Sequence, residues 1–140
     1  MRSAIVLVLT LIVAGCAYMP TNVTRIQMTA RDGGAVYTGI IKRTLPAVVN
    51  ITVEVDRRVY YGNFELTYPN ETFGLYRVYG LPRDAAPATA QPSGRTNYSR
   101  AILSSSDQRI LRCDFTDDAG WDARGLCVDE ASRVYDVSMS

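Results

Sequence analysis

The feature that most constrains the fold is a strict alternation of apolar and polar side chains over residues 48–66. In the first half the apolar residues are Val49, Ile51, Val53 and Val55, with Asn50, Thr52 and Glu54 between them. After Asp56 and Arg57, Tyr60, Gly62, Phe64 and Leu66 share one face. A period of two puts alternate side chains on opposite faces, so the pattern predicts a hairpin with one buried and one wet face. Because Arg57 disfavours positive φ, we expect a loop slightly longer than two residues.

The same pattern recurs along the chain. Strands are predicted at 24–30, 37–41, 75–79, 98–105, 109–115, 124–128 and 133–139, with a turn at 31–34, and no segment shows helical periodicity. Seven to nine short strands predict an all-β fold, either an antiparallel sandwich or a small barrel. The 140 residues suffice for one domain, expected at 23–140.

Residues 80–97 interrupt the alternation. The segment contains three prolines and no large apolar residue after Leu81 apart from the start of the next strand. We expect a long flexible loop, which is either a spacer or a partner-binding segment.

The N-terminus reads as an export signal. Arg2 is followed by an apolar run from Ala4 to Val13, which is shorter than the ~20 residues that span a bilayer. The four residues Val13, Ala14, Gly15 and Cys16 then resemble the lipobox of bacterial lipoproteins. This resemblance implies that residues 1–15 are a cleaved signal peptide and that Cys16 becomes the acylated first residue. The chain also resembles, in layout, small β-rich envelope lipoproteins.

The resemblance places the domain beside a membrane. Residues 16–22 would form a lipidated N-terminus and tether that reaches at most ~20 Å. Ala17 follows Cys16. In the family, an Asp at this position often retains the protein in the inner membrane, so its absence favours the periplasmic side of the outer membrane. Removal of Arg2 leaves 14 basic and 14 acidic side chains, so no nucleic-acid partner is expected. The partners expected are the bilayer and an envelope protein or glycan.

Cysteine and histidine usage constrain the chemistry. The chain has no histidine, which excludes Ser-His-Asp and Cys-His catalysis and disfavours zinc. Cys113 and Cys127 flank the centre of a predicted hairpin, so they are expected opposite each other as a cross-strand disulfide. A redox-active pair is the weaker alternative because the spacing is not Cys-x-x-Cys.

Two groups of acidic residues are candidate sites. Asp114, Asp117, Asp118 and Asp122 lack the spacing of an EF-hand and are interpreted as a solvated turn, with a non-standard calcium site as the alternative. Glu54 and Glu65 could face each other across the 48–66 hairpin as in a glycoside hydrolase, but both lie on the polar phase. We therefore expect no catalytic residues, no metal and no cofactor.

Aromatic residues supply the remaining candidate site. Tyr60 and Tyr61 must point to opposite faces, and Tyr60 is expected in the core. The possible partner-binding residues are Tyr61, Tyr68, Phe73 and Tyr76. The sequence thus favours a non-enzymatic, membrane-anchored binding or structural domain. The alternative is a lysozyme-type inhibitor lipoprotein, whose signature is only partly matched by residues 131–135.

Overall fold

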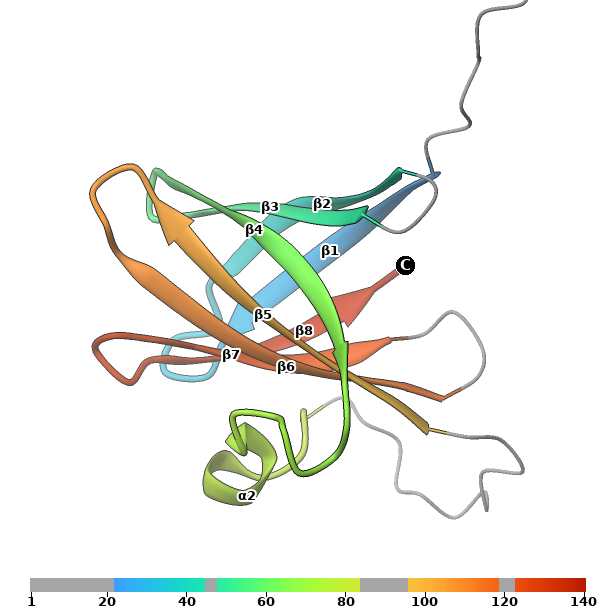
Figure 1. Ribbon diagram of the computed structural model, residues 1–140. Helices are drawn as coiled ribbons and strands as arrows, with labels where there is room; N and C mark the ends of the chain where they lie inside the picture. The colour runs from blue at the N-terminus through green and yellow to red at the C-terminus, as the bar shows by residue number, and fades with distance from the viewer. Residues whose placement is uncertain (1–21, 45–47, 84–95, 119–122) are drawn as a thin grey trace, which may run out of the picture.

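The computed structural model describes residues 22–44, 48–83, 96–118 and 123–140. Its strands are β1 (Asn22–Ala30), β2 (Val36–Thr44), β3 (Val48–Val55), β4 (Arg58–Thr67), β5 (Thr96–Ser105), β6 (Ile110–Asp118), β7 (Arg124–Asp129) and β8 (Val134–Met139). Each strand pairs antiparallel with the next, and β8 returns to pair with β1 (Figure 1). The all-β prediction is confirmed, and the closed barrel is the correct one of its two architectures.

The barrel interior is the hydrophobic core. Its buried members come from all eight strands and are Ile26, Met28, Ala30, Ile41, Ile51, Val53, Val55, Tyr60, Ala101, Leu103, Leu111, Cys113, Phe115, Cys127, Tyr135, Val137 and Met139. The expected phases of β3 and β4 are confirmed, since Ile51 and Tyr60 point inward. Leu66 was expected on the buried face but is 81% exposed, because it lies near the end of β4, beyond the packed interior.

Glycines allow neighbouring strands to approach closely inside the wall. A Cβ on Gly39 would overlap the carbonyl oxygen of Thr52, and one on Gly62 would overlap the carbonyl oxygen of Ile102. Both obstacles are backbone atoms of the adjacent strand and cannot swing aside. These two positions therefore accept only glycine at the present strand separation.

The turn between β3 and β4 corrects a sequence prediction. Val55 pairs with Arg58, so the loop has two residues and is not longer. Asp56 and Arg57 take φ values of 50° and 64°, as a type I′ turn requires. The Asp56 carboxylate accepts hydrogen bonds from Tyr37 Oη at 2.7 Å and from Arg133 Nη1 at 3.0 Å. Tertiary contacts thus support a conformation that the two residues disfavour by themselves.

Two other hairpin turns share one design. In each, the first residue accepts a hydrogen bond from the backbone N–H of the fifth: Ser105 Oγ from Arg109 and Asp129 Oδ1 from Arg133. The fourth residue of each turn has positive φ. Ser105 and Asp129 thus each stabilise the turn that follows their strand.

Residues 75–79 correct a second prediction, because they form the helix α2 (Leu75–Tyr79) and not a strand. The helix begins after Gly74, whose φ is 73°, and ends at Gly80. One helical turn is too short to show a 3.6-residue period, which is why the sequence pattern missed it. No helix within the described ranges is long and apolar enough to cross a membrane.

Candidate binding surface

Residues 68–83 run across the outside of the barrel and are called the strap here. In Figure 1 its helix α2 lies outside the wall, and its contacts are with β6 and β7. Beneath the strap lies Leu126 of β7. Its neighbours Gly125 and Cys127 face the barrel interior, so the Leu126 side chain points outward, yet it is fully buried. The strap therefore covers an apolar position on the outer face of the barrel.

Asp114 holds the first half of the strap. Its side chain is fully buried, and its two carboxylate oxygens accept hydrogen bonds from the backbone N–H groups of Phe73 and Leu75, both at 2.9 Å. The sequence interpretation of Asp114 as part of a solvated acidic turn is therefore wrong. It lies on the outward phase of β6 between two core residues, and the strap removes it from solvent.

A buried ion pair holds the second half. Arg31 Nη2 lies 2.8 Å from Asp136 Oδ1, and both side chains are largely buried. Arg31 also donates to the carbonyl oxygens of Tyr79 and Leu81, and the Arg83 N–H donates to Asp136. Residues 80–83 of the predicted flexible loop are thus tied to the barrel, and β5 already begins at Thr96.

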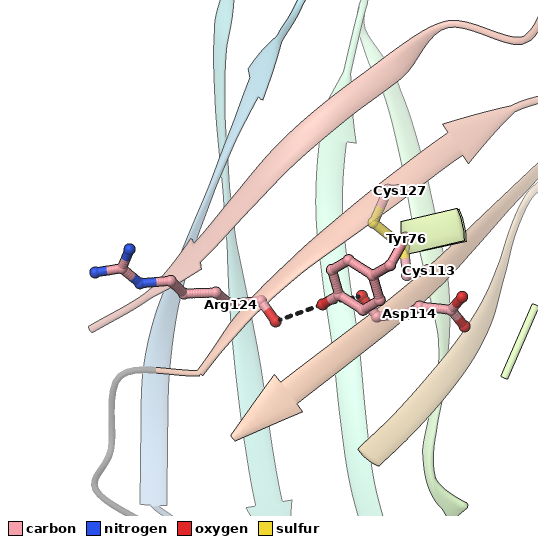
Figure 2. Close-up of a disulfide and its surroundings, with 5 residues drawn as sticks. All are labelled: Tyr76, Cys113, Asp114, Arg124 and Cys127. Carbon is pink, nitrogen blue, oxygen red and sulfur yellow. Dashed lines mark hydrogen bonds between the residues drawn. A yellow bond between two sulfur atoms is a disulfide. The ribbon is translucent and has the colours of Figure 1, made fainter. Parts of the chain in front are cut away.

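The disulfide joins Cys113 to Cys127 inside the barrel wall (Figure 2). The two residues are directly paired across β6 and β7, with 4.1 Å between their Cα atoms. Both side chains are fully buried. The predicted cross-strand bridge is present, in the register that the sequence spacing indicated.

Tyr76 is a structural residue of the strap. Its hydroxyl donates to the carbonyl oxygens of Asp114 at 3.3 Å and Arg124 at 3.2 Å (Figure 2). Burial raises the pKa of Tyr76 to about 12. Its hydroxyl is therefore occupied internally, and the expected aromatic surface does not extend through Tyr76.

An open groove lies on the outer faces of β4 and β5. Tyr61, Gly62, Asn63, Glu65, Arg100, Ile102 and Ser104 line its volume of about 480 Å³. Tyr61 and Ile102 are 54% and 53% exposed. The Tyr61 hydroxyl donates to Asn50 Oδ1 at 3.0 Å, so contact with β3 fixes the ring orientation.

Arg100 connects this groove with the strap. Its Nε donates to Glu65 Oε2 at 3.3 Å, and its Nη1 donates to the Glu71 carbonyl oxygen at 2.8 Å. Its guanidinium carbon also lies 5.7 Å from the centroid of the Phe73 ring, which is a cation–π distance. The Arg100 side chain is thus held in place by three contacts.

The four aromatic residues of the sequence prediction have different positions. Tyr61 lines the groove, Phe73 lies against Arg100 at its margin, and Tyr68 is exposed on the strap. The sequence prediction missed Arg100, Ile102 and Ser104 on β5. Ile102 could have been recognised from the sequence, because it is an apolar residue among the polar side chains on the outward face of that strand.

The remaining candidate residues of the sequence are not brought together into a site. Glu54 pairs with Val59 and Glu65 with Arg100, so the two carboxylates do not face each other. In the segment 131–135, Arg133 forms ion pairs with Asp32 and Asp56, and Tyr135 is in the core. Among the described residues, no three Cys, Asp or Glu side chains are grouped to hold a metal ion.

Several sequence predictions fall on residues outside the described ranges. These are the signal peptide, Cys16 and its tether, Asp122, and the loop from 84 to 95. The side chains of Asp117 and Asp118 are likewise not described. Comparison of the chain with protein-family models, with curated proteins and with solved structures finds no match.

Proposed function

We propose that this chain is a lipid-anchored, non-enzymatic binding module of the bacterial cell envelope. In this proposal Cys16 carries the acyl chains and the barrel presents the β4–β5 groove to an envelope component. The observation that carries the binding role is the groove itself, in which Tyr61 and Ile102 are exposed while Asn50 and Glu65 hold neighbouring side chains in fixed positions. Prior ordering of side chains lowers the entropic cost of binding.

The barrel suits a scaffold role. Its interior is filled by apolar side chains from every strand, so specificity must come from the outer wall. β1 begins at Asn22, six residues after Cys16, and a tether of that length keeps the barrel within about 20 Å of the anchoring surface. A rigid module held close to a membrane can bind a component that lies in or next to the same membrane.

The anchor is tested by the mass of the mature protein. We expect the full chain, expressed in a bacterium, to lose residues 1–15 and to gain acyl chains on Cys16. Cys16→Ser should lack the acyl mass and, because the lipobox is lost, should keep residues 1–15. An unmodified mature Cys16, or acyl mass on the Cys16→Ser variant, would contradict the anchor.

The binding role is tested by site-specific photo-crosslinking in the lipidated protein. A photoreactive amino acid replaces Ile102 in the groove or, as a control, Val36, which is equally exposed on β2. We expect a discrete envelope adduct from position 102 and none from position 36. The same adducts from both positions, or none from position 102, would remove the groove as the binding surface.

A further inference from the structure

The chemistry of the β4–β5 groove points to one class of ligand. Its lining combines one exposed aromatic ring, one aliphatic side chain, an amide at Asn63, a hydroxyl at Ser104 and the Glu65–Arg100 ion pair. The single cation and the single anion of the lining are paired with each other. The groove therefore offers no net charge to attract a charged ligand.

The polar groups of the lining are well suited to hydroxyl groups. An amide and a hydroxyl both donate and accept, Arg100 donates, and Glu65 accepts, so the lining can satisfy groups that themselves do both. Sugar hydroxyls have this dual character. Hydrogen bonds to charged partners are the stronger ones, and the ion pair supplies such a partner in each direction.

The apolar part of the lining fits the same ligand. Tyr61 is 54% exposed, and its hydroxyl is held by Asn50. The C–H faces of a sugar ring pack against an aromatic side chain, while its hydroxyl edge remains available for hydrogen bonds. A purely apolar peptide would instead bury Asn63 and Ser104 without partners, which costs free energy.

We propose that the β4–β5 groove binds a neutral glycan chain, with Tyr61 as the stacking residue and Asn63, Glu65, Arg100 and Ser104 as the hydrogen-bonding residues. The volume of about 480 Å³ lies within the range of small-ligand sites and accommodates a short oligosaccharide segment. This inference rests on the proposed binding role and names the class of its partner.

The test measures binding of soluble neutral hexasaccharides, namely N-acetyl-chitohexaose, cellohexaose and maltohexaose, to the full-length lipidated protein in detergent. We expect saturable binding of at least one by calorimetry. Tyr61→Ala should weaken it about fivefold or more, whereas Val36→Ala, which shortens an equally exposed apolar side chain on β2 outside the groove, should not. Affinity should change little up to about 0.5 M NaCl, because no net charge contributes.

A second measurement uses the unmutated protein, so its result does not depend on whether the Tyr61→Ala variant folds. Amide resonances of Tyr61, Asn63, Arg100 and Ser104 should shift on titration, and those of β1 should not. Absence of saturable binding by all three hexasaccharides would overturn the glycan inference, as would shifts confined to another surface or an unchanged affinity in Tyr61→Ala. If a groove-specific protein adduct then remained in the crosslinking experiment, the binding role would stand with a protein partner. Loss of both results would reject both proposals.

Discussion

At the residue scale, Asp114 has the largest consequence for the fold. A buried carboxylate is unfavourable unless its oxygens are hydrogen-bonded, and here two backbone N–H groups of the strap satisfy them. The arrangement also satisfies the N–H group of Leu75, the first residue of α2, where Gly74 offers no side-chain cap. One side chain therefore fixes both a strand position and a helix start.

Asp114→Asn should destabilise the protein by about 1–3 kcal/mol, because an amide has one acceptor oxygen for two N–H donors. The loss is measured as a lower urea midpoint with an unchanged slope. Glu130→Gln is the matched control: its pair with Arg109 is exposed, so the expected loss is about 0.5 kcal/mol. Equal losses in the two variants would contradict the anchoring role of Asp114.

Because Tyr76 is buried, the free energy of unfolding should depend on pH in the alkaline range. Burial raises its pKa to about 12, above the value of about 10 for an unfolded tyrosine. Its contribution is complete below pH ~10 and is lost as the pH rises towards ~12, because the unfolded chain ionises first. Burial also raises the pKa of Tyr60 and Tyr135, so the wild-type protein should lose stability steeply in this window.

Tyr76→Phe isolates the contribution of this residue. At neutral pH it should be less stable by about 1 kcal/mol because the hydroxyl hydrogen bonds are gone. Between pH ~10 and ~12 it should lose less stability than the wild-type protein, measured by urea midpoints at both ends of the window. Parallel pH profiles for the two proteins would show that Tyr76 does not titrate as expected.

At the scale of elements, the β3–β4 hairpin has a turn whose sequence and conformation disagree. Asp56 has two side-chain partners that compensate, whereas Arg57 adopts positive φ at a cost typical of a residue with a Cβ. The strain is therefore concentrated at Arg57. The strap shows the reverse case, since its short helix follows glycine and begins at backbone groups that Asp114 satisfies.

Arg57→Gly should raise the free energy of unfolding by about 0.5–1 kcal/mol. Relief of the strain at positive φ exceeds the entropy that glycine adds to the unfolded chain. Asp56→Gly is the informative comparison, because it also removes the acceptor for Tyr37 and Arg133 and should stabilise less or destabilise. A lower urea midpoint for Arg57→Gly would contradict this account of the turn.

At the scale of the whole molecule, closure of the barrel and the internal disulfide act together. β8 pairs with β1, so neither has a free edge along its paired residues, and every core side chain faces a shared interior. Cys113 and Cys127 lie inside this wall with no exposed surface. A reductant therefore reaches the disulfide only when the barrel opens.

Reduction of the native protein should consequently track its unfolding. We expect the Cys113–Cys127 bond to resist a mild reductant in the absence of urea and to react at urea concentrations where the barrel unfolds. The Cys113→Ser and Cys127→Ser double variant should lose about 3 kcal/mol, the value for closing a loop of this length. Rapid reduction of the folded protein, with its circular dichroism unchanged, would contradict the burial argument.

Much of the fold was predictable because strand phases are local. Alternation in 48–66 assigned Ile51, Val53 and Tyr60 to the interior and Tyr61 to the outside, and the spacing of the cysteines gave their register. The prediction that Leu66 is buried was wrong, because a local period of two does not indicate where along a strand the packed interior ends. Of the groove, only Tyr61 was identified as a binding residue. Half of the other lining residues, Arg100, Ile102 and Ser104, belong to β5 and meet β4 only in the folded sheet.

The sequence by itself determined the class of fold, the inward face of most strands and the disulfide, all of which follow from short-range periodicity and spacing. Only the tertiary structure decided that the sheet closes, that residues 75–79 are helical and that Asp114 and Asp136 are buried. Those features depend on residues 41 and 105 positions apart, as in Phe73 with Asp114 and Arg31 with Asp136. Residues this far apart in sequence meet only when the chain folds, so a local sequence pattern does not indicate which of them will be in contact.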